Sequence, residues 1–242
     1  MDRRELFKVF GTAGMGLALG GAALAAPDHN AGAAHGGKAP GPLHGGHFHF
    51  CGIHMAKKDP RIQVITQHYC TAHSGDGQDS MFQCVLFDTA AQNAKLLGVE
   101  YVITDKTYRQ LPDGEKKYWH PHTYEVLGGM LTAPGMGPQE EMKIMKMILT
   151  TWGKAWHTWP DPKSAVPVGE PLLIWSLTGD GQADPSVVAE RDKEFNVSTA
   201  KLRERRCQEL GLEVPRVSLP KAMDAVGRQW TDDGDDRPKR RR

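Results

Sequence analysis

The sequence predicts an α+β fold, with a mainly antiparallel sheet of about five strands, one inserted helix and C-terminal helices. Most segments rich in β-branched and aromatic residues precede residue 133, whereas helical periodicity dominates after residue 185. The glycine-rich turn Ser74-Gly75-Asp76-Gly77 joins two early strands, which favours an antiparallel meander over parallel crossovers. Strands followed by helices are typical of α+β domains.

The predicted strands share short runs of apolar and β-branched residues that suit a pleated, partly buried surface. These strands are Arg61–Thr71, Phe82–Phe87, Leu97–Thr104, Thr123–Thr132 and Pro171–Thr178.

The inserted helix is predicted over Gln139–Trp152. Met142, Met145 and Leu149 recur there at helical spacing, and Gly153 stands at the expected stop. The C-terminal helices are predicted over Val187–Phe195 and Ser198–Leu210.

The first 25 residues resemble a bacterial twin-arginine export signal. Arg3 and Arg4 precede Val9–Ala25, which is uncharged and contains five glycines, so it is too short and glycine-rich for a membrane span. Ala23-Leu24-Ala25 supplies a small-x-small cleavage pattern, so the mature chain is expected to begin near Ala26. The expected partners are the twin-arginine export machinery and signal peptidase, and the expected location is the periplasm or the exterior.

The rest of the chain is predicted to contain one domain, over residues 47–212. A flexible Gly/Ala/His-rich leader is predicted at 26–46 and a loosely ordered charged tail at 213–242. The mature chain has no second apolar stretch of membrane-spanning length. Among the 242 residues of the full sequence, 30 Lys and Arg balance 29 Asp and Glu, which argues against nucleic-acid binding because no broad positive field results.

His120 and His122 are the strongest candidate metal ligands. On an extended chain their side chains project to the same face and can hold one ion, with Glu125 nearby as a third ligand. On a regular strand Glu125 faces away, so it joins them only through a turn at Pro121 or a bulge. The expected cofactor is one transition metal ion, which is zinc, iron or copper.

His157 and His68 complete this site if the fold brings them near His120. The alternative is that each packs as a partly buried histidine bonded to the backbone. A second group of potential ligands is an imidazole and thiol cluster that is either solvated or packed, and it comprises His44, His47, His49, Cys51 and His54.

Cys70 and Cys84 flank the first predicted hairpin, and in an oxidising periplasm they form a disulfide if they face each other. The chain has no Gly-x-Ser-x-Gly elbow, phosphate-cradling loop or dinucleotide fingerprint, which argues against hydrolase, kinase and nicotinamide chemistry.

The region around His120 partly resembles the cupin metal motif, since Gly114 lies six positions before His-x-His. The match then fails, because the cupin glutamate comes one or two residues later than Glu125 and Glu115–Trp119 reads as helix instead of strand.

An ordered series of motifs resembles the oil body-associated protein family across residues 47–206. The longest motif runs from Leu111 to Val126, and the others include His68-Tyr69-Cys70, Leu97-Gly98-Val99-Glu100-Tyr101, Trp152-Gly153-Lys154, His157-Thr158-Trp159 and Thr178-Gly179-Asp180-Gly181-Gln182. The resemblance implies a fold shared by plants and bacteria, and plant members are associated with lipid droplets. Family members in the cytosol show cysteines at positions similar to Cys70 and Cys84, which implies that the fold does not require that bridge.

Three functional hypotheses follow. The first is an exported member of this family that binds one transition metal through His-x-His without assigned catalysis. The second is a metal-dependent, cupin-like enzyme in which an open coordination position activates water or oxygen. The third is a structural or lipid-surface protein whose helices after Val187 contact a membrane or a protein partner.

Overall fold

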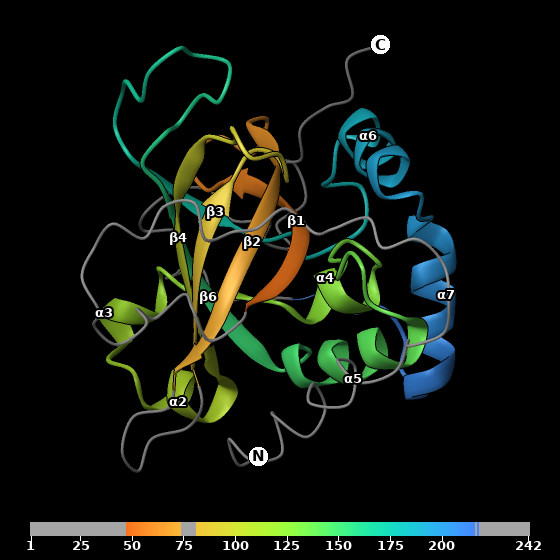
Figure 1. The fold of residues 1–242 in the computed structure, drawn as a ribbon. Helices are drawn as coiled ribbons and strands as arrows, with labels where there is room; N and C mark the ends of the chain where they lie inside the picture. The colour runs from red at the N-terminus through yellow and green to blue at the C-terminus, as the bar shows by residue number, and fades with distance from the viewer. Residues whose placement is uncertain (1–46, 74–80, 216, 218–242) are drawn as a thin grey trace, which may run out of the picture. The chain divides into compact units, whose positions relative to one another are not determined.

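Six antiparallel strands close into a barrel in the computed structural model, which describes residues 47–73, 81–215 and 217 (Figure 1). The sheet order is β4-β3-β2-β1-β7-β6-β5, and β4 also pairs with β6, which closes the ring. Strand β5 lies end to end with β7, because both pair with the same side of β6. The strands are β1 (Phe48–Ala56), β2 (Gln63–His73), β3 (Met81–Phe87), β4 (Leu96–Thr104), β5 (His120–Pro121), β6 (Thr151–His157) and β7 (Leu172–Trp175).

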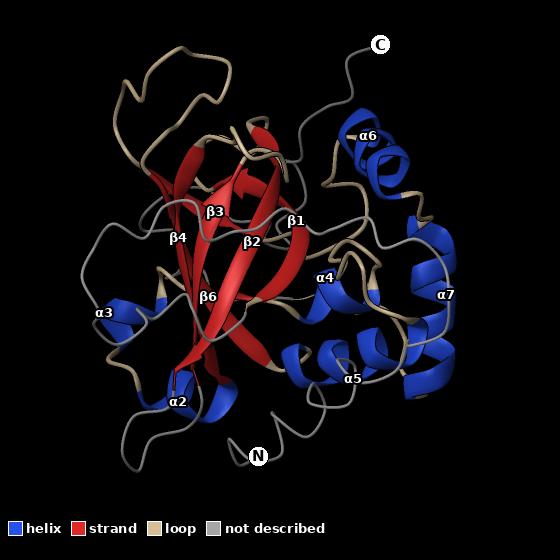
Figure 2. Ribbon diagram, viewed as in Figure 1, coloured by secondary structure: helices blue, strands red, loops and turns tan. Residues whose placement is uncertain are grey.

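Helices cover the barrel unevenly (Figure 2). Helices α4, α5, α6 and α7 lie on the side of the barrel formed by β1, whereas α2 and α3 lie on the side of β4. Val187 and Val188 of α6 pack against a core cluster that includes Ile53, Tyr124 and Trp175. The helices are α2 (Asp105–Gln110), α3 (Asp113–Lys116), α4 (Thr123–Leu127), α5 (Pro138–Ile148), α6 (Pro185–Phe195) and α7 (Thr199–Leu210).

The α+β fold with a mainly antiparallel sheet is confirmed, but the sheet has seven strands instead of about five. Four of the five predicted strands are present as β2, β3, β4 and β7, and β1, β5 and β6 are additional. Strand β1 has no solvent-exposed face in its buried part, because Ile53 and Met55 face the helices while Gly52 and His54 face the interior. The polar and apolar alternation that marks a half-buried strand is therefore absent.

The strand predicted over Thr123–Thr132 is wrong. Helix α4 begins at Thr123, and the chain after it meets β1 through the bridge between Cys51 and Thr132. Two buried arginines from α6 and α7 donate hydrogen bonds to the backbone carbonyls of this segment, so these carbonyls need no partner in a sheet. Arg191 and Arg206 donate hydrogen bonds to the carbonyls of Val126, Gly129, Met130 and Leu131.

The single inserted helix predicted over Gln139–Trp152 is also corrected. Helix α5 ends at Ile148, and α2, α3 and α4 precede it. Gly153 is not a helix stop but lies inside β6, where alternate residues from Thr151 to His157 are buried. Pairing with β4 on one side of β6 and with β5 and β7 on the other overrides the helical pattern of its first residues. The two predicted C-terminal helices are present as α6 and α7.

Cys70 and Cys84 form a disulfide between directly opposed positions of β2 and β3, with their Cα atoms 4.0 Å apart. The predicted export signal at 1–25, the leader at 26–46, the turn at 74–77 and the tail from 218 lie outside the described residues. Within the described part of the chain, no helix is long and apolar enough to cross a membrane.

Candidate metal centre

The barrel interior holds a cluster of polar side chains from five strands and the start of α4. Each of them is at most 5% exposed. The strands bring these side chains together because each one occupies an inward-facing position of its strand. Residues that pair directly across neighbouring strands face the same side of the sheet. The cluster, called here the histidine cluster, comprises His54, His68, Glu100, His120, His122 and His157.

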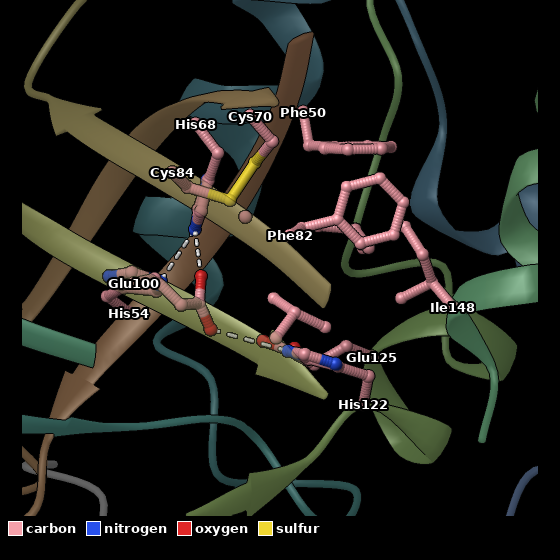
Figure 3. Close-up of a pocket in the computed structure, with 13 residues that line it drawn as sticks. Phe50, His54, His68, Cys70, Phe82, Cys84, Glu100, His122, Glu125 and Ile148 are labelled. Carbon is pink, nitrogen blue, oxygen red and sulfur yellow. Dashed lines mark hydrogen bonds and ion pairs between the residues drawn. A yellow bond between two sulfur atoms is a disulfide. The ribbon is translucent and has the colours of Figure 1, made fainter. Parts of the chain in front are cut away.

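Glu100 lies at the centre of the histidine cluster (Figure 3). Its Oε2 is 3.1 Å from Nε2 of His68. Its Oε1 is 3.1 Å from Nε2 of His120 and 3.4 Å from Nε2 of His122. Two sets of potential ligand atoms therefore meet at one carboxylate, namely His54, His68 and Glu100 in one set and Glu100, His120 and His122 in the other, with all atoms of a set within 4.8 Å.

Hydrogen bonds outside the cluster orient His122. The Thr151 hydroxyl donates to the carbonyl of Ile148 at 2.7 Å, so it accepts from Nδ1–H of His122 at 2.8 Å. In the neutral ring the lone pair is then on Nε2, which faces Glu100. A lone pair and a carboxylate oxygen repel each other, so this contact requires a proton or a metal cation between them. Such outer hydrogen bonds are typical of metal-binding histidines.

Gly153 explains how three ligand atoms converge. Its position on β6 is opposite both His120 and Val102. A Cβ atom there would lie 2.2 Å from Oε1 of Glu100, 2.6 Å from Nε2 of His120 and 2.8 Å from Nε2 of His122. Any side chain would occupy the space that the three atoms surround, and glycine inside a strand often marks close approach of a ligand.

His120 has one further unusual feature. Its Nδ1 is buried and has no hydrogen-bond partner among the described residues. An unpaired buried polar atom is costly, and such atoms often lie at functional sites. Burial also lowers the pKa of His120, which favours the neutral imidazole that binds metals.

The electrostatics of the cluster favour neutral His54, His120 and His157 and an ionised Glu100. Burial lowers the pKa of His54 well below 6.5 and that of His157 to about 3. Burial by itself would raise the pKa of Glu100, but hydrogen bonds from His120, His122 and His68, when their Nε2 atoms carry protons, outweigh burial and hold the pKa of Glu100 well below 4.5. His120 and Glu100 therefore present the ionisation states that metal ligands need.

Glu125 lines the same cavity but belongs to neither set of converging ligand atoms. Burial, with a smaller contribution from the charge of Glu100, raises its pKa well above 4.5. The carboxylate beside His120 and His122 is thus Glu100. The signal for Glu100 was available in the sequence, because an acidic residue in the middle of an apolar strand shares its face with Gly98 and Val102.

The other candidate ligands separate into two groups. His68 joins Glu100 and His54 directly, whereas His157 contacts His54 through Nε2, 3.0 Å from Nδ1 of His54. His49 lies outside the cluster, stacked on Tyr69. Of the described imidazole and thiol groups near the leader, only His54 enters the barrel site. His44 lies outside the described residues.

A cavity of about 30 Å³ adjoins the cluster. Its polar wall includes His68, Glu100 and His122, and its apolar wall includes Phe50 and Phe82 (Figure 3). This volume is large enough to hold a water molecule. The arrangement can hold a metal ion and leaves room beside it for a ligand the size of water.

The metal-free protein is expected to lose stability as the pH falls from 7 to 5. The pKa values of His54, His120 and His157 are lower folded than unfolded, so the unfolded chain takes up protons below pH 6.5 that the folded chain excludes. For His157 alone the free energy of unfolding should fall by about 2 kcal/mol at pH 5. Glu125, whose pKa is raised in the folded protein, opposes this loss of stability above pH 4.5. Glu100, whose pKa is lowered in the folded protein, adds to the loss of stability mainly below pH 4.5.

Urea denaturation of chelator-treated protein at pH 7 and pH 5 measures this change. His157→Gln should show a smaller pH dependence than the wild type, because one of the three histidines is removed. An unfolding free energy that does not change between the two pH values would contradict the burial of neutral histidines.

The fold and the site define a class of protein in which a closed barrel surrounds histidines that gather at one carboxylate. Residues 41–209 match the family described as "Protein of unknown function (DUF1264)", and the chain belongs to this family. The resemblance to oil body-associated proteins is thereby also confirmed, through relatives that carry that name.

Oil body-associated protein 1B of Arabidopsis thaliana is 34% identical over 174 residues, which cover 72% of this chain and 70% of the relative. Oil body-associated protein 1A of Zea mays is 36% identical over 173 residues, with 71% of each chain covered. Oil body-associated protein 2A of Zea mays is 32% identical over 179 residues, covering 73% of this chain and 68% of the relative. No solved structure matches the chain.

Proposed function

We propose that this chain is an exported metal-binding protein that holds a transition metal ion, which is zinc, iron or copper, at Glu100, His120 and His122. The observation that carries the proposal is the space at Gly153, around which one carboxylate oxygen and two imidazole nitrogens converge. Two imidazoles and a carboxylate form a donor set used by both zinc and non-haem iron sites.

The export part of the proposal rests on two independent features. The twin-arginine pair, Arg3 and Arg4, precedes an uncharged segment with a cleavage pattern. The disulfide between Cys70 and Cys84 fits an oxidising compartment, where disulfides form and persist.

A metal-dependent enzyme is the second candidate, and the cavity beside Glu100 and His122 favours it. A bound metal would act as a Lewis acid or lower the pKa of a bound water. The residues of this chain would position the ion, exclude bulk water and limit the accessible reactant to a small molecule. Glu125 also lines the cavity and is a buried carboxyl group that can hold a proton there.

Association with a lipid surface is what the names of the plant relatives describe for those proteins. In this chain, the apolar residues Val187 and Val188 of α6 pack against the barrel core instead of forming a free apolar face. We therefore give the metal centre priority over a lipid-surface role.

The test is the metal content of protein purified from the periplasm, dialysed against a chelator, and reloaded with Zn²⁺, Fe²⁺ or Cu²⁺ separately. We expect the wild type to retain at least one equivalent of one metal, and His120→Ala to lose one equivalent relative to it. His49→Ala is the matched control, because His49 stacks on Tyr69 outside the cluster and should not change the metal content. A wild type that retains no metal would contradict the proposal.

A further inference from the structure

We propose that a second metal ion binds among His54, His68 and Glu100, so that Glu100 bridges two ions in a dinuclear centre. This inference rests on the proposed function, because the first ion is the one held by Glu100, His120 and His122. The sequence patterns pointed to one ion only.

The two oxygens of Glu100 face different histidines. Oε1 faces Nε2 of His120 and His122, and Oε2 faces Nε2 of His68. One carboxylate that presents each oxygen to a separate set of imidazoles has the form of a bridging ligand. Bridged ions in two-metal sites are close together, which suits two sets that share a single side chain.

The hydrogen bond from His68 to the backbone places the proton of its neutral ring on the side away from Glu100. Nδ1 of His68 lies 3.1 Å from the carbonyl of Thr66, and a carbonyl only accepts, so Nδ1 carries the proton in the neutral ring. The lone pair on Nε2 then faces both Oε2 of Glu100, at 3.1 Å, and Nε2 of His54, at 2.8 Å. The Nε2 lone pair of His68 and the Glu100 carboxylate oxygen face each other there, and a cation between them would relieve their repulsion.

His157 supports the orientation of His54 from behind. Its Nε2 is 3.0 Å from Nδ1 of His54. If His54 donates from Nδ1, its Nε2 is free to bind an ion together with His68. In the metal-free state, the opposite direction gives an unbroken chain of donors from His157 through His54 to His68 and on to the Thr66 carbonyl. In either direction, the neutral His68 ring offers no proton to Glu100.

The cavity provides the third observation. Its lining includes His54 and His68 from the second site, His122 from the first, and Glu100 from both. Its volume of about 30 Å³ therefore adjoins both sets of ligands. It has room for one water molecule, which can complete the coordination of both ions.

The experiment is Zn²⁺ stoichiometry, measured by elemental analysis of full-length mature protein after loading and removal of free metal. We expect two equivalents in the wild type and one in His54→Ala, because His54 contacts only the second set. His120→Ala should also retain one equivalent. Glu100→Gln should lower the Zn²⁺ occupancy of both sites. His49→Ala, on the same strand as His54, should retain two equivalents.

Copper loading separates the two proposals by a second readout. Two Cu²⁺ ions joined by Glu100 should be magnetically coupled, so the wild type should lose most of its isolated-Cu²⁺ resonance, and His54→Ala should regain it. His54→Gln provides a variant of closer size, and circular dichroism checks that each variant is folded. One equivalent in the wild type, unaffected by His54→Ala and lost in His120→Ala, would overturn the second site but leave the proposed function. No equivalents would overturn both.

Discussion

Replacement of Gly153 by alanine is expected to abolish metal binding at Glu100, His120 and His122. The new methyl group would lie 2.2 to 2.8 Å from all three ligand atoms, so it occupies the space where they converge. The ligands must either move apart or leave the ion unbound. We expect the affinity to fall by about 100-fold or more, beyond the usual effect of changing a residue outside the ligand set.

The matched control is Gly52→Ala on β1. A Cβ atom at Gly52 would meet the nearest side-chain atoms, on Leu131 and His68, at 3.4 and 3.6 Å, which is ordinary contact. Its metal content should equal that of the wild type. Thermal denaturation of the metal-free proteins separates lost binding from lost folding. A folded Gly153→Ala protein that binds metal with wild-type affinity would exclude this site.

Replacement of Arg206 by methionine is expected to cost about 3 to 5 kcal/mol of unfolding free energy, as is usual when one partner of a buried charge pair is removed. Arg206 is fully buried on α7. Its guanidinium donates to the carbonyls of Val126 and Leu131 at 2.7 and 2.8 Å and contacts Glu141 at 2.5 Å. Methionine fills much of the volume but removes the guanidinium from both carbonyls and leaves Glu141 with Arg205 as its ion-pair partner.

Arg203→Met on the same helix is the control. Arg203 pairs with Asp180 near the surface, with 38% of its side chain exposed, so its loss should cost less than about 1 kcal/mol. Urea denaturation of both variants measures the difference. Because Arg206 connects α7 to the segment that follows His122, its variant should also weaken metal binding. Equal stabilities of the two variants would contradict a structural role for the buried arginine.

Local signals were sufficient for the helices near the C-terminus. Asp184 caps α6, where Pro185 occupies the first turn, and Ser198 caps α7 by accepting from the amide of Lys201. These preferences act over a few residues, so they are readable without the fold. The strands β2, β3, β4 and β7 were recognised for a similar reason, because β-branched and apolar residues are concentrated within each of them.

The segment that follows His122 and the strand around Gly153 depended on distant partners. Arg206 bonds to carbonyls from 75 and 80 residues earlier, which allows the chain after α4 to leave the sheet. Gly153 lies in a strand because β4 pairs with β6 and encloses it, although the preceding residues continue a helical pattern. Such long-range contacts outweigh local propensity and leave no local trace.

The sequence by itself determined the class of fold, the family, and the choice of His120 and His122 as a pair of candidate ligands, although His122 lies at the start of α4 and not on an extended strand. Only the tertiary structure decided that Glu100 is the shared carboxylate and that His54 and His68 form a second set around it. The physical reason is that pairing of β1, β2, β4 and β6 brings together side chains far apart in the chain. A motif records only neighbours along the sequence, whereas closure of a barrel selects neighbours across its interior.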